Sequence, residues 1–583
     1  MGTISDKLMR IINTKEDIRQ ALISKGYDVP TSIPFKEYAK MILDLPCNAD
    51  PFPDIEGIVA RYSDSGLTNE QMAANPVWAD KTGNGRDLQL KNFSWKRMSG
   101  VGGYVQDFND FRNNATVDKI RIDEQSSNSV KVTILTTRIG NAIYIPKNIY
   151  QFNKSYFIKI SSEGYDEGDM ALLFYAPSTS TATTVTVSLN PNGITEIPAI
   201  KEDDFLAVYI NVSGKVGSFT VEQLPLYPGA LVFDGVDDYG VCENFPILTK
   251  EKGYTVVALR QWDQDFLNTT LTGGLLSTRN YSTGEGVAFE KIESSNKGYW
   301  NLGAGGIIDF AKSPFTWQTS KQYNNVGILK GDKNHGKPLC VGCGLSGGQQ
   351  CGRFAIWELV FLDHDATEEE LTKIKDYFVK TYPWLFPDQA WTVTGKTNED
   401  EDRATIANIT GNGNDLVLSN FGFIEGSGYN KEGEYAGYLV TDGVDDKITS
   451  SIFEMGNDWT VIGDWELINT GKKDNAGIVK FDSIVIYNYN PILINIKNGR
   501  NNLIPDQNTV NAICSDGRIY SKDWKESIYN EETESTSKNF LTIGYSGNSY
   551  TKIAFKNLAI YPTVLSKEDC IKAYNYLQTI KAK

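Results

Sequence analysis

The fold of this chain is decided by a stretch that occurs twice, TGNGRDLQLKNF at 82–93 and TGNGNDLVLSNF at 410–421. These two segments start 410 − 82 = 328 residues apart. A second matching pair, ALVFDGVDDYG at 230–240 and YLVTDGVDDKI at 438–448, is separated by 442 − 234 = 208 residues between its Asp-Gly steps. Because the separations differ by 120 residues, we infer two copies of one domain and an insertion of about 120 residues in the first copy.

Each copy continues with matching strand signals in the same order. After DGVDD come YTVV at 254–257 or WTVI at 459–462, and later LCVG at 339–342 or LTIG at 541–544. Both copies then end in a predicted strand and helix, at 354–378 and at 553–577, with Thr367 and Ser566 as the helix N-caps. Short strands with two-residue periodicity between Gly- and Asp-rich turns favour antiparallel sandwiches.

The insertion, at about 99–226, has its own strand pattern. Alternating or continuous β-branched and aromatic runs occur at 130–134, 156–160, 183–189 and 205–212. We interpret the insertion as a third β-sandwich, the alternative being an elaborated loop.

The N-terminal residues differ from the rest of the chain. Their apolar residues recur at helical spacing, but two short helices cannot bury a core of their own, so we expect them to attach to a partner. The side chains expected to make that attachment are Ile18, Leu22, Phe35, Tyr38 and Ile42. The predicted division is a helical segment 1–45, a Pro-punctuated linker 46–54, a first domain 55–98 with 227–386, the insert 99–226, and a second domain 387–583.

Composition narrows the function. The net charge of −16 in 583 residues, with no basic cluster, argues against nucleic acid and anionic membrane surfaces as partners. We expect no targeting segment and no membrane insertion, because no apolar run is long enough for either. Seven unevenly spaced cysteines suit folding in a reducing cytoplasm.

The order of these blocks resembles the LamG, or concanavalin A-like lectin/glucanase, jelly roll. The resemblance implies two face-to-face antiparallel sheets per domain and a glycan at the rim or concave side, sometimes beside a calcium ion. A helical N-terminus before tandem repeats also resembles fibre and appendage proteins of tailed, crAss-like phages. That resemblance implies a head or tail fibre of the virion, made in the host cytoplasm. The implied partners are capsid or tail proteins, host-surface glycans, and further copies of the chain in a homotrimer.

Residues for catalysis are poorly placed. Glucanases of this fold need paired carboxylates, and the nearest candidates are Glu358, Asp363 and Asp365, whose spacing does not suit one strand face. The second copy has Asn557 in place of Glu358, and the chain has only two histidines, His335 and His364. We therefore expect no enzyme. The alternatives are a glycan-degrading depolymerase or glucanase, and a purely structural decoration protein without a ligand.

Two kinds of metal site are conceivable from the sequence. His335, Cys340, Cys343 and Cys351 offer zinc ligands, but adjacent strand residues point to opposite faces, and the second copy has no cysteine here. The two DGVDD segments are the second candidate, because carboxylates around a Gly suit calcium. Asp and Gly are also the residues that suit a hairpin turn without a metal. No cofactor is required, and calcium could be held by Asp237 and Asp238, with Asp234, and by Asp445 and Asp446, with Asp442.

Sugar binding calls for exposed aromatic faces beside polar groups. Each tryptophan could equally be a core residue, and we place Trp357 and Trp459 in the core. The candidate platforms are Trp262, Tyr299, Trp300 and Trp317 in the first copy, and Trp465 and Trp524 in the second.

Overall fold

The structure is a computed structural model. It describes Lys15, Arg19 and residues 52–582, apart from 114–118, 138–139, 152–153, 176–182, 201–206, 213, 250, 268, 279–287, 292–296, 301–305, 310–325, 331–337, 346–348, 434, 469–476, 481–483, 489–491, 497–499, 505–509, 523, 529–540 and 547–548. The predicted attachment residues Ile18, Leu22, Phe35, Tyr38 and Ile42 therefore lie outside the described residues.

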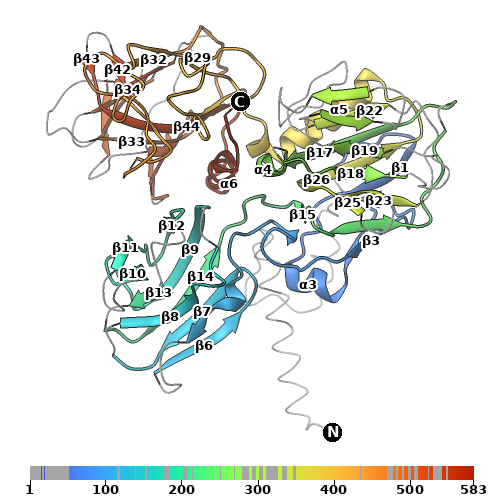
Figure 1. Cartoon of the computed structure of the whole chain (residues 1–583), viewed down its shortest axis with the longest axis horizontal. Coiled ribbons are helices and arrows are strands. Elements are labelled where there is room, and N and C mark those ends of the chain that lie inside the picture. The colour runs from blue at the N-terminus through green and yellow to red at the C-terminus, as the bar shows by residue number, and fades with distance from the viewer. Residues whose placement is uncertain are drawn as a thin grey trace.

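The described chain is mainly β, and its strands build three sandwiches (Figure 1). The predicted fold class, mainly β with two antiparallel jelly-roll sandwiches and a further β-sandwich inserted into the first, is confirmed. Among the described residues, all but one of the strand pairings are antiparallel, and the exception is the parallel bridge between Gly274 and Cys351.

The first sandwich consists of two facing sheets. One sheet runs β22 (Val326–Lys330), β17 (Thr255–Trp262), β26 (Arg353–Leu362), β15 (Leu231–Asp234) and β4 (Gly100–Val101), with β1 (Ile58–Tyr62) also paired to β26. The other runs β2 (Val77–Trp78), β3 (Leu88–Lys91), β16 (Tyr239–Cys242), β23 (Leu339–Val341), β18 (Gly273–Ser277), β19 (Ala288–Lys291), β20 (Lys297–Trp300) and β21 (Gly306–Asp309), with β24 (Cys343–Leu345) and β25 (Gln349–Cys351) attached.

The second sandwich repeats this topology. Its first sheet runs β30 (Gly428–Tyr429), β31 (Leu439–Val440), β44 (Ile553–Tyr561), β33 (Thr460–Leu467), β38 (Val510–Cys514), β39 (Arg518–Ser521) and β40 (Glu526–Ile528), with β27 (Gln389–Thr392) on β44. Its second sheet runs β28 (Thr405–Ile406), β29 (Leu416–Ser419), β32 (Lys447–Thr449), β41 (Thr542–Ile543), β34 (Gly477–Lys480), β35 (Ile484–Asn488), β36 (Ile492–Ile496) and β37 (Arg500–Ile504), and β42 (Tyr545–Ser546) pairs with β43 (Ser549–Tyr550). Even the irregularity in the central strand recurs, after Leu259 in β17 and after Asp464 in β33.

The insert is a sandwich of two five-stranded sheets. They run β11 (Thr183–Ser188), β10 (Met170–Tyr175), β13 (Ala207–Val212), β8 (Gly140–Pro146) and β5 (Arg112–Asn113), and β12 (Ile194–Ile197), β9 (Tyr156–Glu163), β14 (Gly217–Gln223), β7 (Ser129–Ile134) and β6 (Ile120–Gln125). It lies between β4 and β15, where the second sandwich connects β30 to β31 through residues 430–438. Because β4 still belongs to the first sandwich, the insert begins after Val101, slightly later than the predicted residue 99.

The central strands are apolar on both faces because both faces are covered. In β17, Val256 and Ala258 face the opposite sheet, whereas Val257 and Leu259 belong to a different core that includes helix α5 (Glu368–Thr381). Shorter helical elements are α3 (Asn69–Ala74), α4 (Gln264–Leu267) and the 3-10 turns η1 (Phe108–Asp110) and η3 (Pro383–Leu385).

Helices α5 and α6 (Lys567–Gln578) begin as predicted. Thr367 accepts a hydrogen bond from the amide of Glu370, and Ser566 accepts one from the amide of Asp569, which satisfies amides that the first helical turn leaves without partners.

The three sandwiches meet around α6 (Figure 1). From the insert, Phe157 packs edge to face on Tyr574 of α6, with ring centroids 5.4 Å apart. From the first sandwich, the Gln261 amide nitrogen donates to the Thr579 hydroxyl at 3.1 Å. One hydrophobic core accordingly contains buried residues of all three sandwiches.

Candidate functional site

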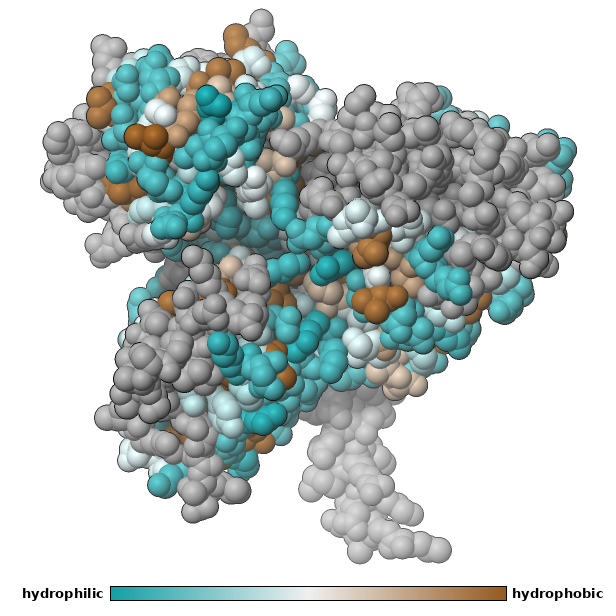
Figure 2. All heavy atoms as spheres, in the orientation of Figure 1, coloured by the Kyte–Doolittle hydropathy of each residue, from teal (hydrophilic) through white to brown (hydrophobic). Residues whose placement is uncertain are grey.

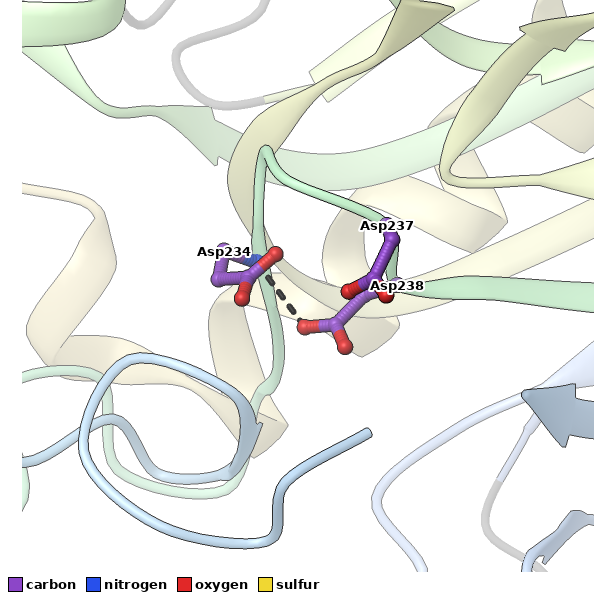
Figure 3. A group of neighbouring side chains, drawn as sticks. All are labelled: Asp234, Asp237 and Asp238. Atoms are coloured by element: carbon purple, nitrogen blue, oxygen red, sulfur yellow. Dashed lines mark hydrogen bonds between the residues drawn. The ribbon is translucent and has the colours of Figure 1, made fainter. Parts of the chain in front are cut away.

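The acidic turn of the first copy joins β15 to β16 (Figure 3). The Asp234 carboxylate accepts from the amide of Val236 at 2.7 Å, and Asp238 accepts from the amide of Asp234 at 3.0 Å. The Ser99 hydroxyl donates to the second oxygen of Asp238, also at 3.0 Å. Gly235 has a φ of +77°, which disfavours other residues. These contacts explain why a turn of this shape uses Asp and Gly.

The second copy builds the same turn. Asp442 accepts from the amide of Val444 at 2.7 Å, and Asp446 accepts from the amide of Asp442 at 2.8 Å. The recurrence of both bonds shows that the repeated DGVDD motif encodes one backbone conformation.

Both turns bring three carboxylates together. In each turn, one oxygen from every Asp lies within 4.8 Å of the others, and among the described residues these are the two groups of His, Cys, Asp or Glu side chains with the spacing of a metal site. Burial raises the pKa of Asp238 to about 7, with the Asp234 charge as a second cause, and burial raises the pKa of Asp446 to about 6. A calcium ion would be held by Asp234, Asp237 and Asp238 or by their second-copy counterparts, and the alternative, a hairpin turn without a metal, also stays a prediction.

The zinc hypothesis gains no support from the thiols. Cys340, Cys343 and Cys351 are buried in one small cluster, and Cys343 lies directly opposite Cys351. Within the described part of the chain, these thiols do not form a group with metal-binding spacing. His335 lies outside the described residues.

Three predicted sugar platforms are wrong. Trp262 is fully buried and stacks on Phe266 with ring centroids 6.1 Å apart. Trp465 and Trp524 are each only 3% exposed, and Trp524 packs against Tyr574 at the junction of the sandwiches. A ring enclosed by protein cannot stack on a sugar.

The remaining aromatic predictions have mixed outcomes. Trp357 and Trp459 are core residues, as predicted. Tyr299 and Trp300 lie in β20, but their side chains are outside what the structure describes, as is all of Trp317.

The Glu358 carboxylate is enclosed within the protein. Arg61 pairs with it at 3.1 Å, and the hydroxyls of Tyr377 and Tyr382 donate to it at 3.1 and 2.9 Å. The side chain is fully buried, and burial raises its pKa to about 7. Asp363, by contrast, is half exposed beside His364. A buried carboxylate saturated by these donors is a structural group, so Glu358 does not contribute to an open paired-carboxylate site.

The structure reveals a cleft that the sequence reasoning missed. It has a volume of about 430 Å³ and lies between the first sandwich and the insert, beside the acidic turn. A single segment, 94–105, forms much of its wall, and the other walls come from residues far apart in sequence. Polar or charged lining residues are Ser94, Lys96, Arg97, Ser99, Tyr104, Gln151, Lys154, Asp234, Asp265 and Arg353.

Ion pairs organise the walls of this junction cleft. Lys96 lies 3.3 Å from the buried Asp107, and Arg97 lies 3.3 Å from Asp110. Elsewhere in the lining, Lys154 is 3.9 Å from Asp265, whose carboxylate also pairs with Lys581 near the end of the second sandwich. All three sandwiches therefore contribute to the charge arrangement around the cleft.

The surface surrounding these features is mainly polar. Figure 2 shows a face that is largely hydrophilic, with hydrophobic residues exposed singly or in small groups. The tips of the two acidic turns, Val236 and Val444, are 74% and 71% exposed. None of the described helices has the length and hydrophobicity needed to span a membrane.

Comparison with known proteins shows similarity at the level of structure. The sequence matches no protein-family model and no curated protein. The Trypanosoma rangeli sialidase in complex with sialic acid aligns over 82% of this chain and 97% of its own, at 8% identity and a TM-score of 0.24. The receptor binding domain of botulinum neurotoxin D covers 58% of this chain and 90% of its own, at 12% identity and a TM-score of 0.24. The botulinum neurotoxin serotype D ligand binding domain in complex with N-acetylneuraminic acid covers 57% and 87%, at 10% identity and a TM-score of 0.23. Similarities this weak carry no argument about function.

Proposed function

We propose that this chain is a non-enzymatic, glycan-binding appendage protein, a head or tail fibre on the particle of a tailed phage. The observation that carries the glycan-binding part is the junction cleft. Its volume of about 430 Å³ falls within the usual size range of ligand sites. Its walls carry both hydrogen-bond donors and acceptors, which suits the hydroxyl groups of a saccharide.

The construction of the cleft supports a binding role. Its walls come from two sandwiches and are braced by buried polar contacts, such as the bonds of the Gln223 side chain to the amides of Val105 and Gln106 at 3.1 and 2.9 Å. Preorganised walls reduce the entropy lost when a ligand binds.

The absence of catalysis is proposed from the candidate carboxylates. Glu358 is sealed under Tyr377 and Tyr382 and cannot reach a glycosidic bond. Paired carboxylates about 5–9 Å apart in an open cleft are what hydrolysis of this kind requires. The enclosed position of Glu358 therefore favours binding over hydrolysis.

Assembly would supply the strength that a single saccharide contact lacks. Multiple weak sites on one particle raise the overall affinity by avidity. We propose that the N-terminal helices attach the chain to capsid or tail proteins and that the chain forms a homotrimer, since fibres are commonly symmetric.

Two measurements test this function. The full chain, fluorescently labelled, is applied to a glycan array, and binding to at least one saccharide class is expected, without cleavage of that saccharide. Immunogold labelling with an antibody against residues 387–583 is then performed on particles of the phage that encodes the chain. Unlabelled particles would contradict the proposed role as a virion appendage, and an array without binding would contradict the proposed glycan binding. Release of sugar from the saccharide would favour the alternative of a glycan-degrading enzyme.

A further inference from the structure

We propose that the junction cleft binds a saccharide bearing a carboxylate, and that Lys154 and Arg353 receive this carboxylate. The inference rests on the proposed glycan binding and specifies the chemical class of the ligand. It is based on which polar groups of the cleft already have partners and which do not.

The two cations are incompletely paired. Lys154 Nζ lies 3.9 Å from carboxylate oxygens of both Asp263 and Asp265, and Arg353 Nε lies 3.6 Å from Asp263. Direct hydrogen bonds between such groups are about 2.7–3.2 Å long. Within the described part of the chain, neither cation makes a hydrogen bond, although both line the cleft and remain 39% and 28% exposed.

The acids around them are better satisfied. Asp263 accepts from the amide of Phe266 at 2.9 Å, and Asp234 accepts from the amide of Val236 at 2.7 Å. Asp265 pairs with Lys581, and this ion pair lowers the pKa of the Asp265 carboxyl against the opposing effect of burial. The cleft thus has hydrogen-bond donors in excess, and a ligand that supplies acceptors is the complement.

A carboxylate suits these donors better than a hydroxyl group. Hydrogen bonds between a cation and a carboxylate are shorter and roughly twice as strong as those between neutral groups, and the planar guanidinium of arginine can bind both oxygens.

The local charge permits an anion to enter. The side chains that line the cleft include four cations, Lys96, Arg97, Lys154 and Arg353, and two carboxylates, Asp234 and Asp265, giving 4 − 2 = +2. The whole chain carries −16. The lining of the cleft therefore presents more cations than carboxylates to an acidic saccharide, although the chain as a whole is acidic.

The test compares two matched ligands on the full chain. The probes are α-1,4-linked trigalacturonic acid and its carboxyl-reduced counterpart, titrated by isothermal calorimetry at low and high salt. The acidic probe is expected to bind about tenfold more tightly, as one or two charge-assisted hydrogen bonds would give. Salt should weaken binding of the acidic probe, because partly exposed charges are screened.

Substitutions locate the effect. Lys154→Gln and Arg353→Gln should each remove most of the preference for the acidic probe. Lys131→Gln serves as the control, because Lys131 also belongs to the insert, is 44% exposed and does not line the cleft. Melting curves of all variants verify folding.

The outcomes separate the two proposals. Equal binding of both probes, a preference for the reduced probe, or an acidic preference unchanged in both cleft variants would overturn the carboxylate assignment while glycan binding stands. If neither probe binds but the chain binds saccharides on the glycan array, the carboxylate assignment is likewise overturned and glycan binding stands. A blank array together with failure of both probes would overturn the proposed function itself.

Discussion

Arg61 and Glu358 form an ion pair in the interior, with Arg61 Nε 3.1 Å from Glu358 Oε2 and side chains that are 4% and 0% exposed. The strand registers place Ala390 and Asn557 at the equivalent positions of the second sandwich. The two copies thus differ here by a matched pair of residues, charged in one copy and neutral in the other. Burial of either charge without its partner would be unfavourable, which explains why both positions differ together.

Removal of one partner should therefore destabilise the folded protein more than removal of both. Arg61→Ala leaves Glu358 buried without its cation and is expected to lower the free energy of unfolding by about 3–5 kcal/mol. The double variant Arg61→Ala/Glu358→Asn reproduces the second sandwich and should recover part of this loss. Urea unfolding of the full chain measures both, with Lys373→Ala at an exposed pair as the control. The single variant Glu358→Asn completes the cycle, and if the double variant loses as much free energy of unfolding as the two single variants together, the two residues are not coupled.

The Glu358 carboxyl should also make stability depend on pH. Burial raises its pKa from 4.5 to about 7, so the folded protein holds this proton more tightly than the unfolded chain. The contribution to stability is complete below about pH 4.5 and is lost as pH rises through 7, by at most a few kcal/mol. Relative to Glu358→Gln, the wild-type chain should lose stability between pH 5 and 8. Parallel urea midpoints for the two proteins across this range would contradict the prediction.

Trp262 should act on stability rather than on ligand contact. It is enclosed by Phe266 and Phe354, so Trp262→Ala is expected to reduce the free energy of unfolding by about 3–5 kcal/mol, and Trp262→Phe by less. Differential scanning calorimetry measures the loss. An alanine variant that keeps its melting temperature but loses glycan binding would return this residue to the role of a sugar platform.

Calcium should leave the thermal stability of the chain nearly unchanged. The turn carboxylates of Asp234, Asp238, Asp442 and Asp446 already accept hydrogen bonds from main-chain amides or from Ser99. A ligand that binds the folded state raises the melting temperature. Melting curves measured with calcium and with a chelator therefore distinguish a calcium site from a hairpin turn that binds no metal. A rise that is lost in Asp237→Asn or Asp445→Asn would establish a cation site.

The sequence by itself determined the architecture, because that information is local and repeated. Two-residue periodicity, the DGVDD turns and the caps at Thr367 and Ser566 all reflect backbone preferences of nearby residues. The differing offsets of the two repeated segments revealed the insertion without any knowledge of packing. The core positions of Trp357 and Trp459 followed from the strands that contain them.

Only the tertiary structure decided which side chains are accessible and which meet. Trp262, Trp465 and Trp524 were candidate sugar platforms, but the facing sheet or α6 buries them, and burial depends on elements far away in sequence. The junction cleft combines Lys96, Lys154, Asp234 and Arg353 from two sandwiches. The Arg61–Glu358 pair likewise joins positions 297 residues apart. Such contacts depend on strand pairing and domain packing, which no local pattern encodes.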